Sequence, residues 1–271
     1  MNGGETILRF EDVTVEFAGV PALKRVSFAV PKGETRVLFG EAGSGKTVAL
    51  KTALGLIRPA EGEVYLFGRE ISGLREEELF DLRSQVGMLF QEGALFDSLT
   101  IEENVAYPLI NQKSIHAPPE EVARRVREAL RFVELEHTLD KYPSELSGGM
   151  RRRVAIARAV VTEPPLVLYD SPTAGLDPIT STTICALIMK NRDLRHTTTL
   201  LVTHRYQNGN LLANYRYDEG SGKLVPATPD RPAPRTVFLG FRGGELVFEG
   251  VQAEMEASSD PYVGKFVKHN G

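Results

Sequence analysis

Apolar positions in the first quarter of the chain follow a pattern that is typical of β-strands, interrupted once by a helical pattern. Residues 7–17 and 26–30 have the strand pattern, and 35–39 (TRVLF) lead directly into a glycine-rich loop. Residues 46–56 predict a helix, and 63–67 are extended again before a turn. A strand, a loop and a helix in this order predict an α/β core.

The middle of the chain predicts a helical insert followed by two buried strands. Between residues 120 and 134, apolar side chains recur at helical spacing while arginines and a glutamate take the other side. We expect a helical subdomain at about 91–160. The apolar strands 166–169 and 198–203 end at Asp170 and His204, where nucleotide sites on sheets are built.

The segment 205–235 differs in texture, because it is rich in glycine, asparagine and proline. We expect it to be an atypical loop and hairpin insertion, with 213–217 pairing with 223–225. Our hypothesis is that this surface hairpin touches a partner. A second hairpin is expected at 237–241 and 245–248. The core domain then spans 1–250, and 251–271 form a C-terminal tail.

Composition narrows the function classes. A chain of 271 residues can bury one α/β unit plus a subdomain. The formal net charge is -4 and no basic block is present, which argues against nucleic-acid binding. The single cysteine, Cys185, is expected to be buried in a helix, which fits a reducing cytoplasm. The N-terminal residues lack signal-peptide features, and no apolar run reaches about 20 residues. A protein of this kind working at a membrane would depend on a partner for the span.

Candidate chemistry begins with the glycine-rich loop. Glycines let successive backbone N–H groups turn inward around phosphate oxygens, and the following helix N-terminus adds to this. Lys46 would add charge at the β- and γ-phosphates, and Thr47 offers a hydroxyl to Mg2+. An ordinary glycine turn at a strand end is the alternative. The predicted nucleotide-binding residues are Gly40, Glu41, Ala42, Gly43, Ser44, Gly45, Lys46, Thr47 and Val48.

Asp170 follows the strand 166–169, and a carboxylate at a strand end can be aimed into a phosphate site. A strand-capping aspartate is the alternative. Together with the glycine-rich loop, Asp170 is predicted to be a magnesium ligand.

A second phosphate-binding segment narrows the family. A helix pattern follows the residues Leu146, Ser147, Gly148, Gly149 and Met150. With this segment the chain resembles the ABC-type ATPases. The resemblance implies an α/β P-loop NTPase fold with an antiparallel β subdomain and an inserted helical subdomain. The resemblance implies that Ser147, Gly148 and Gly149 of one copy close over ATP held by a second copy. It implies Mg2+ at Thr47, Gln91 and Asp170. It also places Gln91, Asp177 and His204 at the catalytic centre, and Phe17 against adenine.

Two positions depart from the family pattern. Ser171 stands where a glutamate would polarise the attacking water, and serine cannot replace that charge. Losing such a group costs on the order of 10²- to 10⁴-fold in rate. A naturally slow ATPase, compensation by another group such as His204 and a deliberate substitution all remain open. Arg205 stands where an acidic residue usually follows the switch histidine, which leaves the geometry of His204 open.

The stretch from Met88 to Leu109 and the closing 259–267 (SDPYVGKFV) resemble the Mla- and Mce-associated ATPases of bacterial phospholipid trafficking, and Met150 also fits. This resemblance implies a peripheral subunit on the cytoplasmic face of the bacterial inner membrane. Its partners would be a transmembrane permease, an MCE lipid-binding protein and a STAS-domain regulator. The permease would dock around Gln91 to Pro108. Small-solute importers share the scaffold and remain an alternative.

Two functional classes follow. In the first, ATP closes a dimer and hydrolysis reopens it, driving the permease. In the second, Ser171 leaves an ATP-gated clamp or regulatory subunit that hydrolyses poorly.

Overall fold

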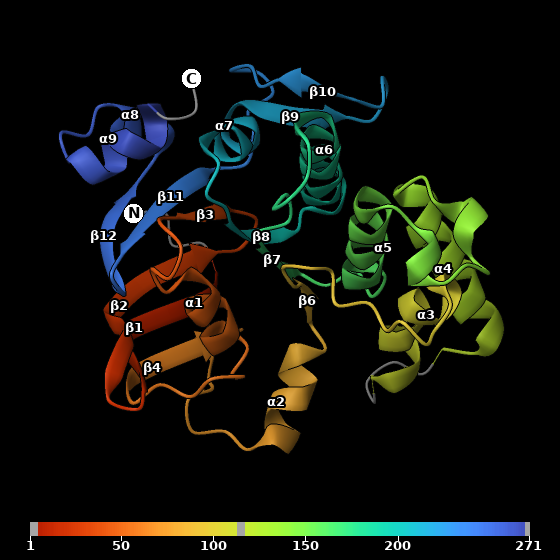
Figure 1. Cartoon of the computed structure of the whole chain (residues 1–271), viewed down its shortest axis with the longest axis horizontal. Helices are drawn as coiled ribbons and strands as arrows, with labels where there is room; N and C mark the ends of the chain where they lie inside the picture. The colour runs from red at the N-terminus through yellow and green to blue at the C-terminus, as the bar shows by residue number, and fades with distance from the viewer. Residues whose placement is uncertain (1–4, 113–116, 269–271) are drawn as a thin grey trace.

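A six-stranded sheet forms the centre of the computed structural model (Figure 1), which describes residues 5–112 and 117–268. The strand order is β12-β11-β3-β8-β7-β6, and every neighbouring pair is parallel except β11 and β12. The strands β3, β7 and β8 are buried along their whole length, as expected for parallel strands covered on both faces. The strands are β3 (Thr35–Phe39), β6 (Val86–Leu89), β7 (Leu166–Asp170), β8 (Thr198–Val202), β11 (Thr236–Arg242) and β12 (Glu245–Gly250).

A second, antiparallel sheet has the order β2-β1-β4-β5. Helix α1 (Lys46–Ala53) shares one hydrophobic core with this sheet and with one face of the central sheet. Phe10 and Phe28 stack in that core with ring centroids 4.6 Å apart. The predicted antiparallel β subdomain is therefore confirmed. Its strands are β1 (Thr6–Phe17), β2 (Val20–Pro31), β4 (Glu61–Leu66) and β5 (Arg69–Glu70).

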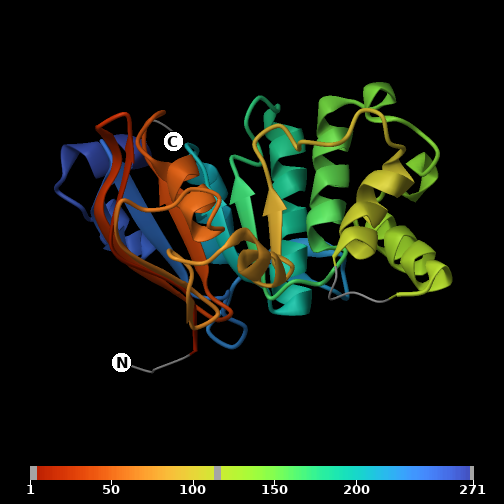
Figure 2. The ribbon, with the colours of Figure 1, turned by 90° about the horizontal axis from the view of Figure 1, so that it is seen from below.

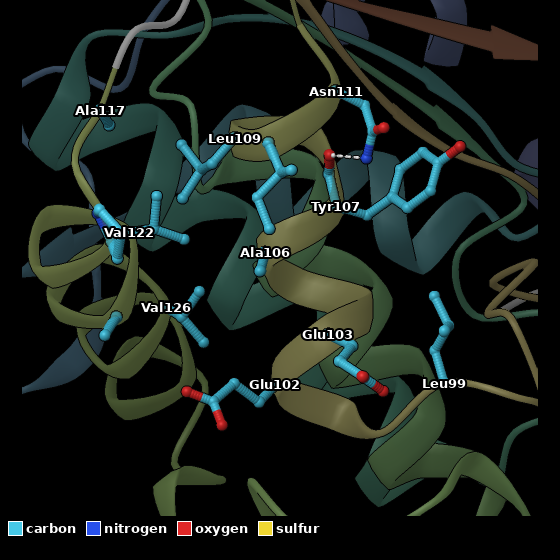
Figure 3. Close-up of a pocket in the computed structure, with 13 residues that line it drawn as sticks. Leu99, Glu102, Glu103, Ala106, Tyr107, Leu109, Asn111, Ala117, Val122 and Val126 are labelled. Atoms are coloured by element: carbon cyan, nitrogen blue, oxygen red, sulfur yellow. Dashed lines mark hydrogen bonds between the residues drawn. The ribbon is translucent and has the colours of Figure 1, made fainter.

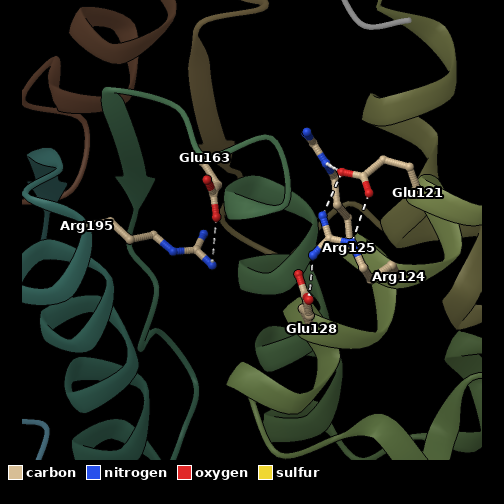
Figure 4. A network of polar contacts seen from close by, with 6 residues as sticks. All are labelled: Glu121, Arg124, Arg125, Glu128, Glu163 and Arg195. Carbon is tan, nitrogen blue, oxygen red and sulfur yellow. Dashed lines mark hydrogen bonds and ion pairs between the residues drawn. The ribbon is translucent and has the colours of Figure 1, made fainter. Parts of the chain in front are cut away.

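The helical subdomain lies at the opposite end of the molecule from the antiparallel sheet (Figure 2). Its helices bury Val126, Leu130 and Ile156 in a second core, which continues to the other face of the central sheet. Arginine and glutamate side chains of α4 pair with one another on its outer side, as Figure 4 shows for Arg124 with Glu121 and Glu128. The elements are α2 (Glu76–Arg83) before the subdomain, then α3 (Ile101–Asn111), α4 (Pro119–Phe132), η1 (Glu136–Thr138), η2 (Pro143–Glu145) and α5 (Gly148–Val160).

The segment 205–235 differs in part from the sequence expectation, because it begins with helix α7 (Tyr206–Asn214) instead of a loop. Tertiary packing explains the helix. Asn208 is buried and donates to Thr173 and Thr203, and Gly209 lies so close to the Phe238 ring that a Cβ would be 2.5 Å from it. The expected hairpin follows, as β9 (Tyr215–Asp218) and β10 (Lys223–Pro226).

The remaining helices complete the cover of the central sheet. Helix α6 (Pro178–Arg195) buries Cys185 completely, which confirms the prediction for that residue, and its burial raises the pKa of the thiol to about 12. Helices α8 (Gln252–Glu256) and α9 (Pro261–Lys268) follow β12. Within the described ranges, no helix is both long enough and apolar enough to cross a bilayer.

Candidate active site

The glycine-rich loop connects β3 to α1 and has the backbone that its glycines permit. Gly40, Gly43 and Gly45 have φ angles of 148°, 76° and 103°. At Gly40 a Cβ would lie 2.2 Å from the Phe241 carbonyl oxygen, and at Gly45 it would lie 2.7 Å from that of Ala22. Only glycine fits these two positions. The loop therefore presents its amides ahead of the α1 N-terminus.

The Lys46 ammonium group lies inside the loop. It donates to the carbonyl oxygens of Gly40 (2.9 Å) and Glu41 (2.7 Å) and to Ser44 Oγ (2.9 Å). Burial lowers the pKa of Lys46 to about 8, against the opposing influence of the Asp170 and Glu41 carboxylates. The loop thus holds a cation that lacks a full counter-charge.

Thr47 and Asp170 meet across the strand end. Thr47 Oγ1 donates to Asp170 Oδ2 at 2.9 Å, and Asp170 is only 3% exposed. Ser171 Oγ lies 3.3 Å from the other carboxylate oxygen of Asp170. Ser171 also has a positive φ of 49° and donates its backbone N–H to Val202. A single carboxylate beside a hydroxyl suits Mg2+, which keeps several waters and takes one or two carboxylates together with phosphate oxygens.

A cavity of about 550 Å³ brings most of the predicted residues together. Gln91, Ser171 and His204 line it opposite the loop residues Gly40, Ala42 to Val48 and the nearby Ala22 and Val202. His204 follows β8, and burial, together with the charges of Arg205 and Lys46, lowers its pKa. His204 is therefore largely neutral near pH 7, and a neutral imidazole can accept or donate a hydrogen bond.

The described residues that line this cavity do not include the 146–150 segment. Ser147 caps α5 by accepting from the Met150 N–H, and it is exposed, as is Gly148. Gly149 lies against Thr180 at the start of α6, where a Cβ would be 2.7 Å from Cγ2. The segment 146–150, predicted to bind a second phosphate, therefore lies outside the cavity at the glycine-rich loop of its own chain.

Asp177 lies beside that segment and caps α6. It accepts from the Thr180 N–H at 3.0 Å, and the pKa of its carboxyl is lowered by hydrogen bonds from the Thr180 hydroxyl and backbone N–H. Asp177 is exposed, and the following Ile179 is 82% exposed. The two helix starts thus form one open surface.

Two arginines, Arg152 and Arg205, connect segments that line or flank the cavity. The sequence predicted neither contact. Arg152 of α5 donates to the carbonyl oxygens of Phe90 and Gln91, which ties α5 to the loop that follows β6 and contains Gln91 (the Gln91 loop). Arg205 donates to Ser181 Oγ (2.9 Å) and to the Leu176 carbonyl (3.2 Å). In the sequence Arg205 is only a departure from the family pattern, whereas in the structure it contacts Leu176, the residue before Asp177. For Arg152, the only sequence signal is that an arginine falls on the buried side of the helix after residue 147.

Phe17 ends β1 and is 50% exposed. The cavity lining does not include it, but Phe17 and Ala22 belong to the same hairpin, whose strands pair at Phe17 and Val20. An exposed ring at this place can stack on a planar group.

A larger cavity of about 730 Å³ lies elsewhere, between α3 and α4 (Figure 3). Its lining is mostly apolar, with Ala106, Leu109, Val122 and Val126 facing the space. Its described lining does not include the glycine-rich loop or Lys46, which line the smaller cavity, or the Asp170 carboxylate that Thr47 contacts. We therefore place the polar chemistry at the glycine-rich loop.

Comparisons with known proteins agree with this geometry. The ABC transporter family model matches residues 23–174. The chain is 35% identical to Protein TRIGALACTOSYLDIACYLGLYCEROL 3, chloroplastic, of Arabidopsis thaliana, over 98% of this chain and 74% of that protein. It is 34% identical to the probable ribonucleotide transport ATP-binding protein mkl of Mycobacterium tuberculosis, over 92% and 72% of the two chains.

A solved structure has the same fold. It is the dimeric post-hydrolysis state of an ATP-binding cassette bound to ADP and Pi, with 31% identity and a TM-score of 0.75 over 90% of this chain and 98% of that one. The glycine-rich loop, the Asp170 strand and the Ser147 segment thus occur in a cassette fold. This chain belongs to the ABC transporter family and is an ATP-binding subunit of that family.

Proposed function

We propose that this protein binds Mg2+ and ATP in the cavity at residues 40–48 and uses ATP to close a dimer that drives a membrane permease. The observation that carries the proposal is the hydrogen bond between Thr47, the residue after Lys46, and the buried Asp170 carboxylate, next to the loop that encloses the Lys46 ammonium group. The loop amides and Lys46 would hold the phosphates, and Thr47, Asp170 and Gln91 would hold Mg2+ with its waters. Phe17 would stack on adenine.

The second half of each ATP site would come from another copy of the chain. Ser147 and Gly148 are exposed and lie outside the cavity of their own chain. Their backbone N–H groups at the start of α5 would bind a phosphate that another copy of the chain holds. Two copies arranged head to tail would place each such end over the ATP of the other, with Asp177 at the interface.

Hydrolysis is the step that Ser171 limits. Its hydroxyl lies beside Asp170 and lacks the charge needed to take a proton from water near neutral pH. The neutral His204 could still orient water or the γ-phosphate. ATP binding and dimer closure do not depend on Ser171, so an ATP-gated clamp with little hydrolysis remains the second candidate.

We propose phospholipid as the transported class. The segments 88–109 and 259–267 resemble the Mla- and Mce-associated ATPases, and the Arabidopsis relative is named after a glycolipid. The subunit would work at the cytoplasmic face of the inner membrane with an MCE lipid-binding protein and a STAS-domain regulator. The mkl relative is named for ribonucleotide transport, so a small-solute importer is the alternative.

The permease would dock beside the Gln91 loop. A cavity of about 390 Å³ there is lined by Phe90, Phe96 and Tyr107 together with parts of β6 and α5. Phe96 and Tyr107 are each 41% exposed, and their ring centroids are 4.7 Å apart. An apolar groove with exposed rings suits a short helix of a partner.

The test is ATP-dependent dimerisation measured by light scattering after size exclusion. With Mg2+ and ATP, we expect the chain to shift from monomer to dimer. Ser147→Arg should still bind ATP but stay monomeric, because a long cation would occupy the phosphate end. Lys46→Ala should bind ATP much more weakly and stay monomeric. A Ser147→Arg variant that dimerises normally with ATP would contradict the shared site.

The lipid branch has its own test. With the permease in lipid nanodiscs, substrate phospholipid should change ATP turnover, and a ribonucleotide should not. The reverse result would favour the solute importer.

A further inference from the structure

Helix α9 lies against the glycine-rich loop, although 221 residues separate the two contacting positions along the chain. The Tyr262 hydroxyl accepts from the Glu41 backbone N–H at 2.9 Å and donates to the Phe241 carbonyl oxygen at 2.5 Å. Lys265, one turn further along α9, pairs with the Glu41 carboxylate at 3.0 Å. One side chain of α9 therefore bridges the loop and the end of β11.

The hydroxyl contacts the loop at its tightest point. A Cβ on Gly40 would lie 2.2 Å from the Phe241 carbonyl and 3.0 Å from Tyr262 Oη. Lys46 in turn donates to the carbonyl oxygens of Gly40 and Glu41. The peptide between Gly40 and Glu41 is thus held from one side by Tyr262 and from the other by the lysine.

Helix α9 is itself firmly placed. Val263 is completely buried in the core. The ring centroids of Phe266 and Phe39 are 4.9 Å apart, and Phe39 is the last residue of β3 before the loop. The guanidinium carbon of Arg242 lies 5.5 Å from the centroid of the Tyr262 ring. Its Nη1 lies 3.8 Å from Oδ2 of Asp260, the residue just before α9. The core therefore fixes where the hydroxyl lies.

We propose that Tyr262 is a positioning residue for the proposed ATP site. Its hydroxyl, through the Glu41 amide and the Phe241 carbonyl, holds the glycine-rich loop in the conformation that binds phosphate. The proposal rests on the proposed ATP site and adds α9 to it. With the hydroxyl gone, the 40–41 peptide loses its only side-chain support from outside the loop within the described chain. The loop can then relax in the nucleotide-free state, and binding must restore its shape.

The test compares Tyr262→Phe with Tyr206→Phe in the full chain. Tyr206 is the matched control, because its hydroxyl ties α7 to α8 through Gln252 and Glu256 and makes no contact with the loop in the described structure. Binding of Mg·ATP is measured by titration calorimetry, and the melting temperature of each nucleotide-free protein is measured beside it. Tyr262→Phe removes the hydrogen bonds to both Glu41 and Phe241, and we expect the loss of the bond to the loop to raise the Kd by about 3- to 10-fold. Its melting temperature should match that of the control.

Lys265→Ala should change the Kd less than twofold, because both members of its ion pair are more than half exposed. An unchanged Kd in Tyr262→Phe would overturn the proposal, and so would an equal rise in both tyrosine variants, which would indicate general loosening of 251–268. In either case ATP binding by the unmodified chain would leave the proposed function standing. Absence of ATP binding by the unmodified chain would overturn the proposed function and this inference with it.

Discussion

We expect Lys46 to make ATP binding sensitive to pH. Burial lowers the pKa of its ammonium group to about 8 in the nucleotide-free protein. A triphosphate next to it would raise that pKa back toward the usual range of a lysine, because negative charge favours the protonated form. ATP should therefore bind the protonated lysine and draw a proton from solvent when the pH exceeds 8.

The magnitude follows from the two pKa values. With a free-state pKa of about 8, the Kd for ATP rises with pH in proportion to 1 + 10^(pH − 8), so the factor is about 1.1 at pH 7, about 2 at pH 8 and about 11 at pH 9. Binding should weaken about tenfold from pH 7 to pH 9, or about 1.4 kcal/mol. His204 and Cys185 do not disturb this window, because the pKa of the first is lowered and that of the second is raised to about 12.

Titration calorimetry at pH 7, 8 and 9, in buffers with different ionisation enthalpies, measures both the Kd and the proton uptake. At pH 9 the uptake should approach one proton per ATP. The variant Lys46→Met should bind weakly at every pH without the rise. A Kd that stays constant from pH 7 to 9, or a rise that persists in Lys46→Met, would refute the assignment of the titrating group to Lys46.

Other predictions concern stability and reactivity. Arg205→Ala removes the donor to the Leu176 carbonyl and should cost about 1–2 kcal/mol in the free energy of unfolding, measured by urea titration, while Arg205→Lys should recover little because a lysine lacks the fork. Gly87→Ala should cost about 1–3 kcal/mol or prevent folding, because its Cβ would lie 2.2 Å from the Ala159 carbonyl oxygen; wild-type stability would show that β6 and α5 can separate. Cys185 should resist iodoacetamide in the native protein and react only after denaturation, as followed by mass spectrometry, and fast native labelling would contradict its burial.

The order of local patterns along the chain predicted the main elements of the fold and the loop. The apolar strand 35–39, the glycine-rich turn and the helix after it are contiguous, so their geometry follows from neighbours in sequence. Helix α7 was missed because its glycine and asparagines favour loops, and only burial against Thr173 and Phe238 makes them helical. Local propensity carries no information about such packing.

The side chains that connect the parts of the site could not be predicted from the chain order. Tyr262 belongs to the segment 259–267 that resembles the lipid-trafficking ATPases, yet its contact with Glu41 depends on how α9 packs on the central sheet. Arg152 reaches the Gln91 carbonyl across 61 positions of sequence. Contacts at such separations are set by the tertiary fold, and spacing along one sequence does not specify them.

The central claim is that this chain is an ATP-driven cassette whose hydrolysis is limited at Ser171, and steady-state ATP turnover tests it most directly. The purified protein with its permease is compared with Ser171→Glu, and Lys46→Ala serves as the blank. The account predicts that the glutamate variant turns over at least about 100-fold faster than the unmodified chain, while both bind ATP. Equal turnover by the two would contradict the claim, because another group would then be activating water.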